Sequence, residues 1–100
     1  MGNNLISQKE LIISLIKDNL INTRLVHGLD TLGLDSGNYH VHLGQTIFNL
    51  IGIEDNRDDL FEEYIEMCEQ VTQMDIFKYP ELLDNHAKGI YKKLVKEKTT

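Results

Sequence analysis

The segment from Asp58 to Met74 constrains the fold most strongly, because its apolar and polar residues fall on opposite halves of a helical wheel. The apolar half comprises Leu60, Phe61, Tyr64, Ile65, Met67, Cys68, Val71 and Met74. The polar half comprises Glu62, Glu63, Glu66, Glu69, Gln70 and Gln73. This separation is typical of an amphipathic α-helix that packs one face against a core, and we expect Asp58 or Asp59 to cap it.

Three further segments have helical patterns. The sequence therefore predicts an all-α fold, a compact up-and-down bundle of four helices at about 7–26, 39–52, 58–74 and 80–97. Ser7 and Glu10 have the spacing of a capping box at the start of the first helix, and Gly28 is suited to end it. Pro80 is expected to open the last helix. We interpret residues 1–100 as a single helical domain, with a few frayed residues at each end.

Residues 39–53 have two interpretations. As a strand, they would place His40 and His42 on one face, where two imidazoles can hold a metal, but no other stretch alternates well enough to pair with them. As a helix capped by Asn38, they place His42 outward and His40 among apolar residues beside Gly44. We favour the helix. Gly44 would then allow a neighbouring helix to approach closely, and His40 would need a hydrogen-bond partner.

No catalytic or metal-binding motif is found in the sequence. It has no Glu-x-x-His pair and no zinc pattern of Cys and His, and Arg57 stands where a calcium loop needs an oxygen ligand. Cys68 lies on an apolar helix face, where burial makes a thiol unreactive. We therefore predict a protein that is not an enzyme and has no cofactor or metal.

Two other functional hypotheses centre on His40. In the first, His40, Tyr64 and Cys68 line a pocket that binds a small ligand or a metal. In the second, weaker one, His40 and a neighbouring carboxylate form the acid and base of a small enzyme.

Charge and cysteine content restrict the partners and the compartment. The formal net charge is −6 and the pI is near 5.0, which disfavours binding to nucleic acid or to a membrane surface. No apolar run approaches the ~20 residues of a membrane span, and we find no secretion signal. The only cysteine, Cys68, cannot form an internal disulfide, so we expect a cytoplasmic protein.

Two surface features favour a non-enzymatic interaction or regulatory protein. Glu62, Glu63, Glu66 and Glu69 form an acidic face that is either a solvated helix surface or a docking face for a basic protein partner. In addition, the first two helices carry many apolar residues, more than a bundle of four short helices readily buries. A homodimer would bury this excess, and we predict self-association.

Overall fold

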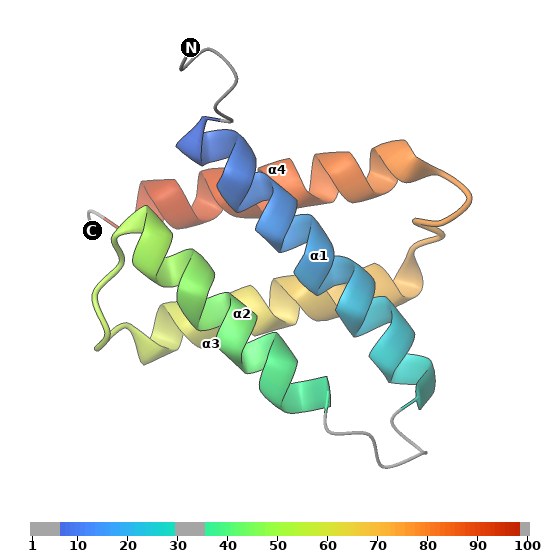
Figure 1. Ribbon diagram of the computed structural model, residues 1–100, viewed down its shortest axis with the longest axis horizontal. Coiled ribbons are helices and arrows are strands. Elements are labelled where there is room, and N and C mark those ends of the chain that lie inside the picture. Colours follow the sequence, from blue (N-terminus) through green and yellow to red (C-terminus); the bar gives the residue numbers. More distant parts are fainter. Residues whose placement is uncertain (1–6, 30–35, 99–100) are drawn as a thin grey trace, which may run out of the picture.

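The computed structural model describes residues 7–29 and 36–98, with side chains for 7–25 and 39–98. Its helices are α1 (Gln8–Leu29), α2 (Ser36–Ile51), α3 (Asp58–Glu69), the short 3₁₀ helix η3 (Gln70–Gln73) and α4 (Pro80–Glu97), and these residues contain no strand. Figure 1 shows α1 and α2 side by side in front of α3 and α4, with α1 crossing α4. Accordingly, α1 packs mainly against α2 and α4. The prediction of an all-α fold of four helices is confirmed.

The first helix begins as predicted but ends later. The backbone N–H of Ser7 donates to Glu10 Oε1 at 3.3 Å, and that of Glu10 donates to Ser7 Oγ at 3.1 Å, which is a capping box. The helix then continues through Gly28 to Leu29. The predictions that Gly28 stops the helix and that it ends near residue 26 were therefore wrong. Glycine weakens a helix by ~1 kcal/mol relative to alanine, but it does not by itself end one.

The second helix includes residues 39–43, so the strand interpretation of this segment was wrong. The helix starts at Ser36, which places Asn38 within its first turn and contradicts the prediction that Asn38 is the cap. Gly52 follows the last turn with φ 96°, and the N–H groups of Gly52 and Ile53 both donate to the carbonyl of Phe48. A glycine in the left-handed region is a common helix stop.

The third helix lacks the predicted cap. Arg57 occupies the N-cap position without a side-chain hydrogen bond, and Asp58 and Asp59 lie in the first turn. Their negative charges there still interact favourably with the helix dipole. The helical path extends through η3, close to the predicted end at residue 74. The last helix opens with Pro80, as predicted.

Apolar side chains from all four helices meet in one core. Its fully buried members include Ile16, Leu20, Ile47, Leu60, Tyr64, Ile90 and Leu94. Gly44 lies where α2 approaches α3. A Cβ atom added there would lie 3.0 Å from Cε1 of Phe61 and 3.1 Å from Cε2 of Tyr64, so even one methyl group would crowd both rings. At Gly44 it is therefore two side chains of α3 that pack against α2, where a close crossing of a neighbouring helix was predicted.

Candidate functional site

A buried polar network links α1, α2 and α3 around His40 and Tyr64. At its centre is Asn19 of α1, which is completely buried. His40 Nδ1 lies 2.5 Å from Asn19 Oδ1, and Asn19 Nδ2 donates to the hydroxyl of Tyr64 at 2.7 Å. The same nitrogen lies 3.3 Å from the carbonyl of His40. Asn19 therefore joins two of the three residues that the sequence suggested for a pocket.

The partners of His40 determine where its proton lies. An amide oxygen only accepts hydrogen bonds, so the bond to Asn19 Oδ1 requires the proton on His40 Nδ1. Thr23 agrees with this tautomer. Its hydroxyl donates to the Asn19 carbonyl at 2.8 Å, which leaves an oxygen lone pair facing His40 Nδ1 at 3.2 Å. In neutral His40, Nε2 therefore carries a lone pair.

The network continues from Tyr64 to Cys68, which lies one helical turn further along α3. Asn19 donates to the Tyr64 hydroxyl, so that hydroxyl is free to donate to the Cys68 sulfur. Burial raises the pKa of the Tyr64 phenol, and the nearby Cys68 raises it further. Burial also raises the pKa of the Cys68 thiol to about 12, against the opposite effect of the Tyr64 hydrogen bond. Both groups are therefore protonated at neutral pH.

His40 is half-buried and its ring stacks on Tyr64, with ring centroids 6.5 Å apart. Burial lowers the pKa of His40, and the negative charge of Glu69 partly offsets this. Nε2 is buried and has no hydrogen-bond partner among the described residues. A neutral imidazole with a free lone pair can accept a hydrogen bond or bind a metal. However, no three Cys, His, Asp or Glu side chains in residues 7–25 and 39–98 are grouped to hold a metal ion.

Two helices supply this network through pairs of residues spaced four apart, which lie on the same helix face. The pairs are Asn19 with Thr23 in α1 and Tyr64 with Cys68 in α3, and α2 supplies His40. Asn19 was not among the predicted site residues. A signal was present, because Asn19 is a polar residue within the apolar arc of the first helix. What the sequence lacked was the register that places Asn19 opposite both His40 and Tyr64.

The acidic face lies on the opposite side of α3 from this network. Glu62, Glu63, Glu66 and Glu69 are all exposed. Lys93 of α4 lies 3.3 Å from the carboxylate of Glu63, so one acid of the face has an ion-pair partner in α4. Exposed pairs of this kind contribute about 0–1 kcal/mol. The four carboxylates therefore form a negatively charged, exposed surface on α3.

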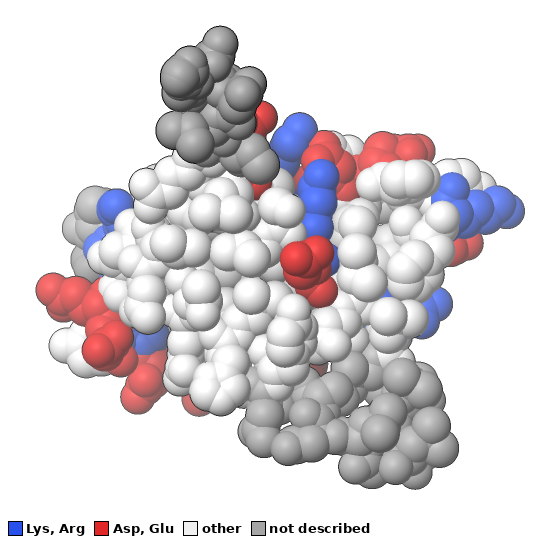
Figure 2. Space-filling view, in the orientation of Figure 1, with Lys and Arg blue, Asp and Glu red and all other residues white. Residues whose placement is uncertain are grey.

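The outward sides of α1 and α2 form a contrasting surface, the α1–α2 face. No residue of α2 is Asp, Glu, Lys or Arg. Figure 2 looks onto this face and shows that, apart from a few charged side chains near its middle, charge lies at its edges. The exposed residues of the two helices in this region include Leu11, Ser14, Asp18, Leu25, Tyr39, His42 and Thr46.

Comparisons of the chain with protein-family models, with curated proteins and with solved structures find no match. None of the described helices combines the length and apolar character that a membrane crossing requires.

Proposed function

We propose that this chain is a non-enzymatic, cytoplasmic interaction protein that self-associates through its α1–α2 face. The observation that carries the proposal is the absence of charge from the whole of α2 in a chain of which 26% is charged. A helix that only needs to be solvated gains from charged residues on its outer side. A protein contact instead favours a surface whose centre is depleted of charge.

Apolar exposure on the same two helices supports the proposal. Leu11, Leu25 and Tyr39 keep 42%, 51% and 53% of their surfaces exposed, respectively. Beside them, Leu15, Ile21, Leu43 and Leu50 are only partly buried. Apolar and aromatic side chains that gather on one face of a protein mark an interaction site more often than scattered ones do.

Charge favours the α1–α2 face over the acidic face as the contact between two copies of the chain. Two copies that met through their acidic faces would bring like charges together, which costs free energy. A twofold contact between two α1–α2 faces avoids that repulsion and keeps the acids of both copies in water. It also leaves the acidic face of each copy, Glu62, Glu63, Glu66 and Glu69, open to a basic protein partner.

The face has a suitable size for such a contact. With 22 residues in α1 and 16 in α2, the helices are about 33 Å and 24 Å long, and each is about 10 Å wide. Side by side they present a strip of roughly 600 Å² in projection. Because side chains protrude from the helices, the accessible area of the strip is larger than its projection and approaches the ~800 Å² that each partner buries in a stable interface.

Sedimentation equilibrium of a charge-insertion variant tests this proposal. The double variant Leu11→Glu/Thr46→Glu places two acids on the face at exposed positions, where folding should tolerate them. Because twofold symmetry doubles the added charge, we expect the dimer to dissociate at least tenfold more readily than the wild type. The control Gln70→Glu/Gln73→Glu adds the same charge at exposed positions of η3 and should leave dimerisation unchanged. A monomeric wild type, or equal effects of the two double variants, would contradict the proposal.

The hypothesis of a ligand pocket at His40 has less support. Its favourable observation is the free lone pair of His40 Nε2. Two clefts that the described residues form, one beside Phe48 and Phe61 and one beside Tyr91, are lined by other residues. The hydrogen bonds of Asn19 to His40 and Tyr64 favour a structural role for this cluster.

A further inference from the structure

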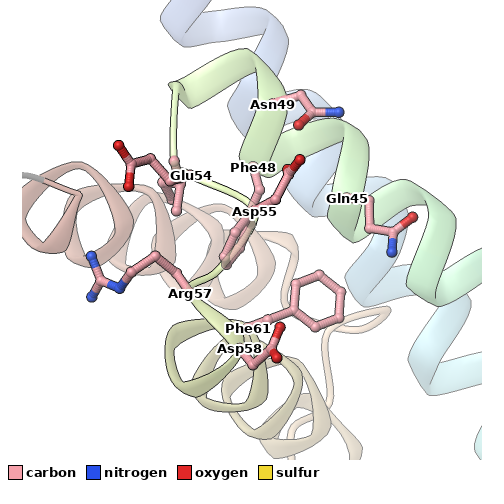
Figure 3. Close-up of a pocket in the computed structure, with 9 residues that line it drawn as sticks. Gln45, Phe48, Asn49, Glu54, Asp55, Arg57, Asp58 and Phe61 are labelled. Carbon is pink, nitrogen blue, oxygen red and sulfur yellow. The ribbon is translucent and has the colours of Figure 1, made fainter.

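A cleft between α2 and the start of α3 is not explained by self-association. Its volume is about 340 Å³, at the lower end of the ~300–1,000 Å³ of ligand pockets. Gln45, Phe48 and Asn49 of α2 line one side, and Asp55, Asp58 and Phe61 line the other (Figure 3). The space therefore suits one side chain or a small ligand.

Two aromatic rings provide its apolar surface. Phe48 and Phe61 are in edge contact, with ring centroids 5.1 Å apart and an interplanar angle of 71°. Phe48 is almost fully buried, whereas Phe61 is half-buried and presents more of its ring. The face of a phenyl ring has a negative quadrupole and attracts a cation within about 6 Å.

Acidic side chains surround these rings without matching bases. Glu54, Asp55 and Asp58 are exposed, and none of them forms an ion pair among the described residues. In Figure 3, Asp55 and Asp58 lie on opposite sides of the pair of rings, and Gln45 and Asn49 add two amide groups. The lining thus combines unpaired negative charge, an aromatic ring and hydrogen-bond acceptors.

The one basic residue of the lining, Arg57, is engaged elsewhere. Its Nη1 donates to the carbonyl of Glu97 at 3.1 Å, and its Nε lies 3.6 Å from a carboxylate oxygen of Asp59. Figure 3 shows its side chain extending away from Phe61. Arg57 therefore leaves the negative charge of Asp55 and Asp58 available to an external cation.

The geometry favours an organic cation over a metal ion. The described Asp, Glu, His and Cys side chains form no group of three that could hold a metal ion. A guanidinium group is planar, offers five N–H donors and stacks on aromatic rings. It can therefore contact Phe61 and carboxylates on two sides at once.

We propose that this cleft binds an arginine side chain of another protein, with the guanidinium against Phe61 and between Asp55 and Asp58. Asp58 of the cleft and Glu62 of the acidic face are four residues apart in α3 and therefore lie on the same helix face, so a basic segment anchored in the cleft could continue along that face. This continuity of negative charge favours a protein partner over a free small molecule. The inference does not depend on dimerisation through the α1–α2 face.

NMR titration of the full-length, ¹⁵N-labelled protein tests this assignment. The probes are capped pentapeptides, Gly-Gly-X-Gly-Gly, in which X is arginine, lysine or glutamine. We expect the arginine peptide to shift the amide signals of Gln45, Asn49, Asp55 and Phe61, with an affinity that falls as salt is added. The lysine peptide should bind more weakly, and the glutamine peptide should not bind.

Matched variants locate the interaction. Asp55→Asn/Asp58→Asn alters two exposed residues and should weaken the arginine peptide about tenfold, as expected for two charge contacts at a partly exposed site. Glu66→Gln/Glu69→Gln removes the same charge outside the cleft and should change its affinity less than twofold. Equal weakening by both double variants, equal binding of the three peptides, or tighter binding of free argininamide than of the arginine peptide would each overturn the proposal. Sedimentation equilibrium of Asp55→Asn/Asp58→Asn should give the same oligomeric state as the wild type. Weaker binding of the arginine peptide would then not be caused by a change in dimerisation.

Discussion

Helices α2 and α3 are consecutive and in contact at Gly44, yet their outer surfaces are opposites. α2 has no charged residue in 16, whereas α3 has two aspartates and four glutamates in 12, with no lysine or arginine. Toward the interior they are similar, because each contributes an aromatic or imidazole ring to the network centred on Asn19. The contrast is therefore confined to the surface, and the demands of a common core do not explain it.

This difference favours a different kind of contact for each of the two surfaces. An uncharged surface can be buried at little electrostatic cost, which suits contact with an identical chain. An acidic surface attracts basic partners over a distance set by ionic strength, of ~8 Å under physiological conditions. The cleft at Phe48 and Phe61 lies at the junction of α2 and α3 and combines both characters.

The largest expected effect comes from removing Asn19 of α1, whose side chain links His40 of α2 to Tyr64 of α3. Asn19→Ala leaves the Nδ1–H of His40 without its shortest hydrogen bond and removes a donor from Tyr64. Because both groups are in or near the core, we expect the free energy of unfolding to fall by about 3 kcal/mol. Urea denaturation followed by circular dichroism measures this change. Asn49→Ala removes an exposed amide of α2 and should cost less than about 0.5 kcal/mol. Equal costs for the two variants would show that the network contributes nothing specific.

A pair of glycine substitutions tests the contact between α2 and α3 more finely. Alanine improves helix propensity by ~1 kcal/mol at either Gly44 or Gly89. At Gly44 the new methyl group would crowd Phe61 and Tyr64 at 3.0–3.1 Å, and overpacking of this kind costs about 1–3 kcal/mol. Gly44→Ala should therefore destabilise the protein by about 1 kcal/mol. At Gly89 nothing lies within 4 Å of the added Cβ, so Gly89→Ala should stabilise it by about 0.5–1 kcal/mol. Thermal unfolding of both variants gives the two signs, and stabilisation by both would contradict the close contact.

The smallest expected effect is a dependence of stability on pH. Burial lowers the pKa of His40 in the folded state, so below the ordinary histidine pKa of ~6.5 the unfolded chain binds more protons. The contribution of His40 is therefore fully present above that value and is lost as pH falls toward the folded pKa. We expect the melting temperature to decrease between about pH 7.5 and pH 5.5 and the decrease to be smaller in His40→Gln. His42→Gln, an exposed histidine on the same helix, should keep the wild-type slope. An identical slope in all three proteins would rule out His40 as the source.

Much of the fold could be predicted from the sequence because the apolar residues recur at helical spacing in all four helices. Helix ends were less predictable. Gly28 continues α1 and Arg57 occupies the N-cap of α3, because tertiary packing can override the local preferences of single residues. The burial of Cys68 and the inward position of His40 followed from the same periodicity.

The sites were less predictable than the fold. The link through Asn19 depends on the register between three helices, which a single sequence does not contain. The cleft depends on the path of residues 52–57, where Gly52 adopts φ 96° and brings Asp55 near Phe61. The acidic face, by contrast, required only the spacing of four glutamates along one helix.

The most direct test of self-association through the α1–α2 face is an isotope-filtered NOE experiment on an equal mixture of ¹³C-labelled and unlabelled protein. In such a sample, filtered signals arise only between different copies of the chain. We predict intermolecular NOEs to the methyl groups of Leu11 and Leu25 and to the ring of Tyr39, and none to α3. Intermolecular NOEs confined to α3 or α4, or no such NOEs at concentrations where sedimentation detects a dimer, would contradict the account.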